Sequence, residues 1–194
     1  MLYSELQCSE AIRKAVERMG FAEMTEIQEK TIPVMLAGHD VIAKAPTGTG
    51  KTCAFGIPVA EHIQPENKYP QAVIMAPTRE LAQQIAEELS NLTYFMPEVQ
   101  VACVYGGANM EKQAKRLAEG CQIVVATPGR LMDHYKHHSI DISHVTQIVL
   151  DEADEMLNMG FYKDVRHIIE MMKARKALSM FSATISREVM DIGW

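Results

Sequence analysis

The sequence has no long apolar run, no closely spaced pair of cysteines and no excess of basic residues. No stretch approaches the ~18 apolar residues of a membrane-spanning helix, and residues 1–5 lack the basic and apolar regions of a secretory signal. The four cysteines, at positions 8, 53, 103 and 121, form no Cys-x-x-Cys pair for zinc or redox chemistry. We therefore expect a cytoplasmic protein without membrane contact, with four reduced and mostly buried thiols.

The charge balance excludes a wholly basic nucleic-acid coat protein. Asp and Glu number 25 against 19 Lys and Arg, which gives a net charge of -6. A local nucleic-acid site is compatible with this balance if fixed dipoles hold the ligand rather than a broad basic surface. With 194 residues, 47% of them hydrophobic, the chain is long enough for one domain with a sizeable core.

Short apolar segments alternate with segments of helical periodicity. The apolar segments, which we predict as strands buried on both faces, are 40–43, 72–76, 99–104, 122–126, 148–150 and 178–181. Apolar residues recur at helical spacing in 12–19, 81–92 and 165–172. The alternation predicts an α/β fold with a mostly parallel sheet and helices on both faces. In such a sheet, ligands bind beyond the carboxyl ends of the strands.

A glycine-rich segment follows the first predicted strand and has the pattern of a phosphate-binding loop, with Ala in place of the first glycine. Its backbone N–H groups would surround the phosphates of a nucleotide. Lys51 would reach the β- and γ-phosphates, and the Thr52 hydroxyl would hold Mg²⁺. The strand before it and the helix after it distinguish it from an ordinary glycine-rich turn. The segment consists of Ala45, Pro46, Thr47, Gly48, Thr49, Gly50, Lys51 and Thr52.

The strand at 148–150 runs into an acidic segment, Asp151-Glu152-Ala153-Asp154. Asp151 would hold Mg²⁺ through a water molecule, and Glu152 would orient or deprotonate an attacking water. Alone, this segment could be the acidic start of an ordinary helix. Downstream of a phosphate loop, it predicts a catalytic set that includes Lys51.

The acidic segment spells Asp-Glu-Ala-Asp and resembles the motif that names the DEAD-box RNA helicases. The phosphate loop also resembles theirs, and the other motifs of the first lobe follow in family order. Gly20-Phe21, Thr25 and Ile27-Gln28 resemble the Q motif, 77–81 motif Ia, Gly106-Gly107 the GG motif, 127–130 motif Ib and 182–184 motif III. Seven motifs in order, from Tyr3 to Thr184, are far more specific than a phosphate loop alone. The resemblance implies a RecA-like P-loop NTPase lobe over 1–194, with the Q motif at about 1–29 and the lobe proper at about 30–194.

In that family the Q motif reads adenine, so the resemblance assigns this role to Phe21, Thr25 and Gln28. The Phe21 ring can stack on the base, and the Gln28 amide matches the N6 donor and N7 acceptor of adenine. From the residues alone, a capped helix with an exposed Gln28 is the alternative. Tyr3 stands where the family usually has Phe, and Met24 where it commonly has Pro. We expect both departures to be minor.

The resemblance also implies a sequence-independent hold on the backbone of single-stranded RNA. Helix starts and arginines can bind phosphates, and glycines let a backbone approach closely. Taken singly, each segment could be an ordinary strand-to-helix loop. The implied RNA-binding residues are Pro77, Thr78, Arg79, Gly106, Gly107, Thr127, Pro128, Gly129 and Arg130. Motif III (Ser182, Ala183, Thr184) would couple the nucleotide site to unwinding, through hydroxyls that bond to the acidic segment.

The later motifs of the family, including the arginines that complete the γ-phosphate site, belong to a second lobe, and we find none of them here. We therefore expect the isolated first lobe of an ATP-dependent RNA helicase, either a truncated gene product or a shortened chain. Its cofactors would be ATP and Mg²⁺, and its partners RNA and the second lobe. We expect a monomer that does not unwind RNA alone. The alternatives are a DNA-directed or remodelling ATPase, against which the Q motif speaks, and a non-catalytic nucleotide- or RNA-binding module.

Two histidines, His134 and His138, lie one helical turn apart and could form a metal-binding pair. We expect instead a solvated helix end, where cationic side chains suit the helix dipole.

Overall fold

The computed structural model describes residues 2–45 and 50–193 of the chain. Within them, six strands form one sheet in the order β1-β6-β5-β2-β4-β3, and every neighbouring pair is parallel. The predicted α/β fold is confirmed, and each predicted strand is found to within two residues at either end. The strands are β1 (Ile42–Lys44), β2 (Ala72–Met75), β3 (Val101–Val104), β4 (Ile123–Ala126), β5 (Gln147–Asp151) and β6 (Ala177–Ser182).

Helices occupy the segments between the strands, and the predicted periodic segments fall on α1, α4 and α8. A short 3-10 helix, η1 (Tyr3–Glu5), precedes them. The α-helices are α1 (Glu10–Arg18), α2 (Glu26–Leu36), α3 (Lys51–Glu61), α4 (Arg79–Leu92), α5 (Met110–Ala118), α6 (Pro128–Lys136), α7 (Ala153–Asn158), α8 (Tyr162–Met171) and α9 (Arg187–Gly193).

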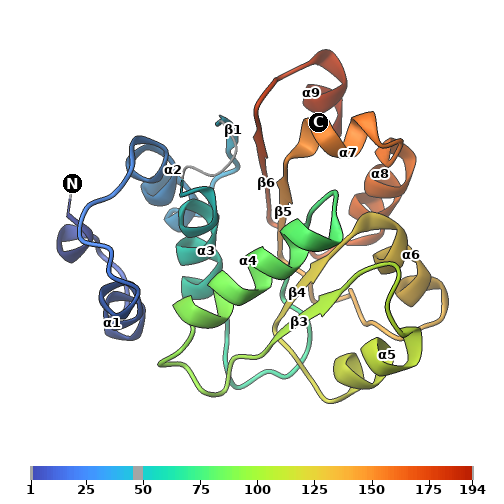
Figure 1. Ribbon diagram of the computed structural model, residues 1–194, viewed down its shortest axis with the longest axis horizontal. Coiled ribbons are helices and arrows are strands. Elements are labelled where there is room, and N and C mark those ends of the chain that lie inside the picture. The colour runs from blue at the N-terminus through green and yellow to red at the C-terminus, as the bar shows by residue number, and fades with distance from the viewer. Residues whose placement is uncertain (1, 46–49, 194) are drawn as a thin grey trace.

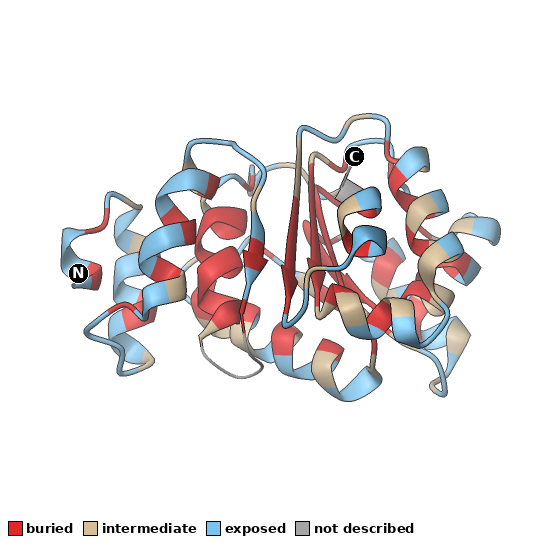
Figure 2. Cartoon of the chain, turned by 90° about the horizontal axis from the view of Figure 1, so that it is seen from above, coloured by how far each residue is buried: buried red, intermediate tan, exposed pale blue. Residues whose placement is uncertain are grey.

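The helices cover both faces of the sheet and form two apolar cores. Ala72 and Ile74 of β2 face one core, while Val73 and Met75 face the other, because successive side chains of a strand point to opposite faces. Helices α1 to α4 contribute to the first core and α5 to α9 to the second (Figure 1). Strands β2, β4 and β5 are accordingly buried between two helical layers whose outer faces are exposed (Figure 2). The edge strands β1 and β3 are only partly buried, so the prediction of burial on both faces is wrong for them.

Five helices of the described chain begin at a residue whose side chain caps the first turn. In each, the side chain accepts a hydrogen bond from the backbone N–H three residues later: Ser9, Thr25, Thr78, Asn109 and Ser186. Such a cap satisfies an amide that has no partner within the helix. The caps at Thr25 and Thr78 fix the starts of two segments assigned above to nucleotide and RNA binding.

Helices α3 and α4 approach closely at Gly56. A Cβ built at this residue would lie 2.7 Å from one methyl carbon of Leu92 and 3.1 Å from one of Leu89. The absence of a side chain on α3 therefore lets α4, which starts beside the candidate site, pack directly against the helix that carries Lys51.

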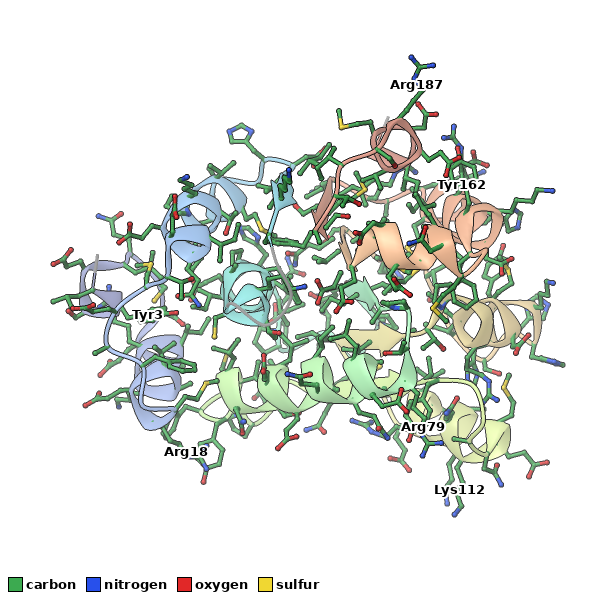
Figure 3. The ribbon with its side chains drawn as sticks, turned by 45° about the horizontal axis from the view of Figure 1, so that its top comes forward. Tyr3, Arg18, Arg79, Lys112, Tyr162 and Arg187 are labelled. Atoms are coloured by element: carbon green, nitrogen blue, oxygen red, sulfur yellow. The ribbon has the colours of Figure 1, made fainter. Side chains whose placement is uncertain are left out.

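The N-terminal segment folds back along α1. Leu2 forms an antiparallel bridge with Glu23, and the Tyr3 N–H donates to the Ala22 carbonyl at 3.0 Å. The Arg13 guanidinium donates to the Leu6 carbonyl at 2.8 Å. These contacts place Tyr3 among η1, α1 and α2 (Figure 3).

All four cysteines are free, as expected, but burial is complete only for Cys53 and Cys121. Cys8 and Cys103 are half-buried. In residues 2–45 and 50–193, no helix is long and apolar enough to cross a membrane.

The expected solvated helix end is wrong for His134, although His137 and His138 are exposed. His134 is fully buried, and its Nε2 lies 3.1 Å from Oε1 of Gln113. It follows the buried Leu131 by three residues, so both lie on the inward face of α6. In the described part of the chain, no group of three or more His, Cys, Asp or Glu could hold a metal ion.

Candidate active site

The three predicted catalytic side chains meet at the carboxyl end of the sheet. Lys51 begins α3, Asp151 ends β5, and Glu152 follows directly. The Lys51 Nζ lies 3.2 Å from Oδ1 of Asp151 and 3.9 Å from Oε2 of Glu152. The side chains come together because β1 and β5 both pair with β6. Only 6% of Lys51 and 1% of Asp151 are exposed, so solvent screens this ion pair weakly.

Burial raises the pKa of both carboxyl groups. For Asp151, burial outweighs the opposing effect of the Lys51 cation and of its hydrogen bonds. For Glu152, burial likewise outweighs Lys51, and the nearby Asp151 carboxylate raises the pKa further. A carboxylate with a raised pKa accepts a proton more readily, which suits Glu152 to the role of a general base.

Glu152 has a strained backbone. Its φ of 51° and ψ of 53° lie in the left-handed region, which residues other than glycine rarely adopt. The Glu152 N–H donates to Oδ1 of Asp151 at 3.0 Å, and its carbonyl accepts from the Met156 N–H at 3.2 Å. Strain of this kind, about 1–3 kcal/mol, is found preferentially at functional sites. It turns the chain sharply between β5 and α7 and keeps the Glu152 carboxylate near Lys51.

The Q-motif residue Gln28 is buried and contacts the end of the phosphate loop. Thr25 and Gln28 form a reciprocal capping box at the start of α2, with the Thr25 N–H donating to Oε1 of Gln28 at 3.0 Å. The Gln28 Nε2 donates to the Gly50 carbonyl at 3.0 Å. The capped helix is thus present, but the exposed glutamine of that alternative is wrong, because Gln28 is only 3% exposed.

The Tyr3 hydroxyl donates a hydrogen bond to the same Gln28 oxygen. Burial, followed by the nearby Cys53 thiol, raises the pKa of Tyr3, so the phenol stays protonated as a donor. The hydroxyl is therefore more than the minor departure expected from the sequence. With both acceptor positions of Oε1 engaged, Gln28 retains one free N–H, the donor that adenine N7 would need.

Phe21, the residue expected to stack on adenine, presents its ring to solvent. It is 46% exposed and stacks on Tyr3 with ring centroids 6.4 Å apart. One face of the ring is thus supported from within the protein, while much of the side chain remains accessible to a planar ligand.

Motif III contacts the acidic segment through Asp154. The Thr184 N–H and hydroxyl donate to Oδ2 of Asp154 at 3.2 and 3.0 Å, and the Asp154 N–H donates to the Ser182 hydroxyl at 3.1 Å. Burial acts to raise the pKa of Asp154, but the hydrogen bonds from Thr184 and Ser182 outweigh it and lower this pKa. The expected link between motif III and the acidic segment is present as a contact, and Asp154, which no sequence assignment included, accepts it.

The phosphate loop is described only at its ends. The Ala45 N–H donates to the Ser182 carbonyl at 2.9 Å, and Gly50 caps α3 with a φ of 74°. The predicted binding residues Pro46, Thr47, Gly48 and Thr49 lie outside the described residues. Thr52, the expected Mg²⁺ ligand, is buried in the first turn of α3.

A cleft of about 100 Å³ opens beside Lys51, and α4 supplies one wall of it. Gln84 and Glu88, one helical turn apart on α4, line this wall opposite Asp151 and Glu152. The sequence analysis did not assign either residue. The only sequence signal for them is that they lie four residues apart, on one face of the helix, and polar residues at this spacing occur on many solvent-exposed helix faces.

The three segments assigned to RNA lie side by side, because β2, β4 and β3 are neighbours in the sheet. Thr78 caps α4 after β2, Gly107 follows β3 with a φ of 84°, and Thr127 precedes α6 after β4. Gly106 and Gly129 have open or ordinary surroundings. Arg79 lies at the end of α4 nearest α5 (Figure 3).

Arg130, in contrast, points into the protein. Only 13% of its side chain is exposed, and its Nη1 donates to the Ala108 carbonyl and to Oε1 of Gln113, each at 3.0 Å. The structure thus brings the expected RNA segments together, but the two arginines differ: Arg130 is bonded within the protein, whereas Arg79 lies at the end of α4. Gln113 is a further residue that the sequence analysis missed.

Comparison with known proteins agrees with this geometry. Residues 25–192 match the family described as DEAD/DEAH box helicase. The chain is 49% identical to the ATP-dependent RNA helicase CshA of Limosilactobacillus reuteri, over 100% of this chain and 39% of that protein. It is also 49% identical to CshA of Listeria monocytogenes, over 98% of this chain and 36% of that protein.

Solved structures show the same fold. A DEAD box protein from the hyperthermophile Methanococcus jannaschii has a TM-score of 0.91 at 40% identity, covering 100% of this chain and 53% of that one. A hypothetical ATP-dependent RNA helicase from Sulfolobus tokodaii has a TM-score of 0.88 at 40% identity, covering 95% and 53%. The chain therefore spans about half of these solved chains and less of the curated relatives. It belongs to the DEAD/DEAH box helicase family, and its sheet and helices form a RecA-like domain of that family.

Proposed function

We propose that this chain is the ATP-binding first lobe of an ATP-dependent RNA helicase. It binds ATP with Mg²⁺ and the backbone of single-stranded RNA, and with a second lobe it couples ATP hydrolysis to the separation of RNA duplexes. The observation that carries the proposal is the contact of Lys51 with Asp151 and Glu152, next to the Gln28–Gly50 hydrogen bond.

The residues at the site fit a nucleotide phosphate and Mg²⁺. Thr52 and Asp151 offer hard oxygen donors of the kind that Mg²⁺ prefers. Since the described residues contain no group of three or more metal-binding side chains, phosphate oxygens and water would complete the coordination shell. Bound there, Mg²⁺ would neutralise charge on the β- and γ-phosphates.

Each catalytic residue has a distinct role in this proposal. Lys51 exchanges its contact with Asp151 for the β- and γ-phosphates. Asp151 then holds the Mg²⁺ shell through a water molecule, and Glu152 orients the attacking water and accepts its proton. The raised pKa of Glu152 supports the last assignment.

Adenine recognition rests on the Q motif. Gln28 donates its remaining N–H to N7 of the base, and its Oε1 exchanges the Tyr3 hydroxyl for the N6 amine, so that both edges of the amide read adenine. Phe21 stacks on the base, and Thr25 fixes Gln28 through the capping box. Because Gln28 also donates to the Gly50 carbonyl, a base bound to Gln28 would be connected to the end of the phosphate loop through one side chain.

RNA is held by helix starts and open backbone rather than by a basic surface. The first turns of α4 and α6 direct N–H groups outward, Gly106 and Gly107 admit a phosphate, and Arg79 supplies a charge. Ser182 and Thr184 contact the acidic segment through Asp154, and this contact would couple the nucleotide site to unwinding.

The lobe extends over residues 1–194, with the Q motif at about 1–29, and it acts as a monomer in the cytoplasm, where ATP and RNA are available. The second lobe supplies the arginines that complete the γ-phosphate site. That this chain covers only 39% and 36% of two ATP-dependent RNA helicases supports the second lobe of this proposal.

Titration calorimetry with ADP and GDP in the presence of Mg²⁺ tests the nucleotide assignment. Guanine presents an acceptor where adenine has its N6 donor, and the mismatch leaves a polar group unpaired. We expect ADP to bind more tightly by ~1–3 kcal/mol. A Lys51→Ala variant, which loses its phosphate contact, is the control and should bind both nucleotides weakly. Equal affinity of the wild-type chain for ADP and GDP would contradict the assignment of Gln28.

A further inference from the structure

A buried polar cluster joins the segments that lie at the RNA face. Gln113 of α5 is at its centre: its Nε2 donates to the Tyr105 carbonyl at 3.0 Å, and its Oε1 accepts from Nη1 of Arg130 at 3.0 Å. The same oxygen lies 3.1 Å from Nε2 of His134. Arg130 also donates to the Ala108 carbonyl. One side chain of α5 thus connects the loop 105–108 with two residues of α6.

The orientation of this cluster follows from its donors and acceptors. Arg130 can only donate, so Oε1 of Gln113 must face it. That oxygen can only accept, so His134 donates to it through Nε2, while burial and then the Arg130 cation lower the pKa of His134 and favour the neutral ring. Gln113 and His134 are 8% and 0% exposed, and in the described structure Nδ1 of His134 has no hydrogen-bond partner. Every polar atom of Gln113 is engaged within the protein.

Tyr105 extends the cluster to α4. Its hydroxyl accepts from Nε2 of Gln83 at 2.9 Å, and the Arg79 guanidinium lies 4.9 Å from the centre of its ring. A Cβ at Gly107 would be 3.8 Å from Nη1 of Arg79. Through its backbone and its side chain, Tyr105 therefore contacts α5 and α4 at once.

We propose that Gln113 and Tyr105 are positioning residues for RNA binding. They hold the start of α4, the loop 105–108 and the start of α6 in one arrangement, so that the three segments bind successive phosphates. This inference rests on the RNA binding proposed above, and it adds which residues organise that surface.

Arg130 then has a different role from Arg79. With its guanidinium donating to Ala108 and Gln113, Arg130 supports the loop from within. Arg79, aligned by the Tyr105 ring, is the arginine that meets a phosphate. Replacing Gln113 would remove one contact of Arg130 and the contact with the Tyr105 carbonyl together, and so loosen the loop without removing a group that binds RNA.

A Gln113→Leu variant, compared with Gln122→Leu, tests the proposal. Gln122 is also a buried glutamine whose side chain makes three hydrogen bonds, with the Gln100 N–H and with the carbonyls of Pro65 and Glu98, but it lies at the amino end of β4, opposite the carboxyl ends where the proposed RNA segments lie. Both variants should lower the thermal midpoint similarly. If Gln113 served only the stability of the fold, the two variants would therefore change oligouridylate binding to the same extent.

The readouts are the affinity for a short fluorescein-labelled oligouridylate, by anisotropy at low salt, and the affinity for ADP. We expect Gln113→Leu to weaken oligouridylate binding by about tenfold, the effect of about 1.4 kcal/mol, with the ADP affinity unchanged. Gln122→Leu should leave both affinities unchanged. Oligouridylate binding that is equal in wild type and Gln113→Leu would overturn this inference alone. A wild-type chain that binds no oligouridylate would overturn both the inference and the proposed RNA binding.

Gln113→Glu separates the two sides of the cluster. The carboxylate still accepts from Arg130 and His134, but it cannot donate to the Tyr105 carbonyl. We expect oligouridylate binding to weaken in this variant as well, with the fold retained. Wild-type affinity in Gln113→Glu would overturn the role given to the contact with Tyr105.

Discussion

Gly50 joins the parts of the site that we propose to bind the base and the phosphates. Its carbonyl accepts from Gln28, its φ is 74°, and a Cβ there would lie 2.6 Å from Nε2 of Gln28. Both the backbone conformation and the close approach favour glycine. A side chain at this position would have to displace the Gln28 amide.

We expect Gly50→Ala to weaken ADP binding by about tenfold, because Gln28 must move away from the base site. Gly38→Ala is the matched control: Gly38 has a φ of 86° but no atom within 4 Å of its Cβ position. Both variants should lose stability through backbone strain, measured by urea unfolding, but only Gly50→Ala should lose affinity in calorimetry. Wild-type ADP affinity in Gly50→Ala would show that the Gln28–Gly50 contact does not serve binding.

His134 makes the stability of the domain depend on pH. Burial, and then the Arg130 cation, lowers its pKa below the ordinary 6.5; Asp133 opposes this shift, and His137 adds to it. Because the folded pKa is lowered, the neutral ring stabilises the fold fully above about pH 6.5. This stabilisation declines as the pH falls from there through the folded pKa.

We therefore expect the free energy of unfolding to decrease between about pH 7.5 and pH 5.5 less steeply in His134→Gln than in wild type. Urea unfolding at both values measures the slope. His39→Gln, which removes an exposed histidine that follows α2 and does not affect the pKa of His134, should retain the wild-type slope. Identical slopes in wild type and His134→Gln would contradict the buried, neutral state of this ring.

At the scale of helices and strands, the contact between α3 and α4 is set by Gly56. Alanine there would improve helix propensity by about 1 kcal/mol, but its methyl group would meet a terminal carbon of the fully buried Leu92. Overpacking of this kind typically costs about 1–3 kcal/mol. The steric effect outweighs the gain in propensity.

We expect Gly56→Ala to lower the free energy of unfolding by about 1 kcal/mol. Leu92→Ala alone should cost about 2–5 kcal/mol by leaving a cavity. In the double variant the new methyl group occupies part of that cavity, so its loss should be smaller than the sum of the two single losses. Additive losses in urea unfolding would contradict the contact.

The strands were predictable because their apolar residues are local and continuous, and the parallel order followed from their alternation with helices. The segments that follow the predicted strands were also predictable, because ligands bind beyond the carboxyl ends of parallel strands, and this placed Lys51, Asp151 and Glu152 in the candidate site. The roles of the Tyr3 hydroxyl, Gln113 and the buried His134 were not predictable. Each depends on a partner from another element, and neither spacing nor residue type reveals which distant side chains meet.

At the scale of the whole molecule, the proposed site would present the charge of Lys51 to the γ-phosphate from one side. Lys51 comes from α3, whereas Arg79 and Arg130 belong to the segments proposed to bind RNA. An arginine supplied from across a cleft is typically worth ~10³–10⁵ in rate. Closure over the nucleotide also requires a second body.

We therefore expect the 194-residue chain alone to show no appreciable RNA-stimulated ATP hydrolysis and no unwinding. Joining it to a second helicase lobe should restore RNA-stimulated turnover, measured by phosphate release. In that joined protein, Glu152→Gln should bind ATP but hydrolyse almost none, while Glu155→Gln, an exposed neighbour, should behave as wild type. If the isolated chain turns over as fast as the joined protein, the site is complete within these residues.

Among the described strands, β1 pairs with β6 alone. The Leu178 N–H donates to the Asp40 carboxylate across 138 positions of the chain. During translation, the segment around Lys51 thus leaves the ribosome long before the strand that holds it in place. Contacts of such sequence separation form late. A nascent chain stalled before Ala177 would already contain Lys51 and the acidic segment, yet it would lack the strand that pairs with both β1 and β5, so we expect nucleotide binding to appear only late in synthesis.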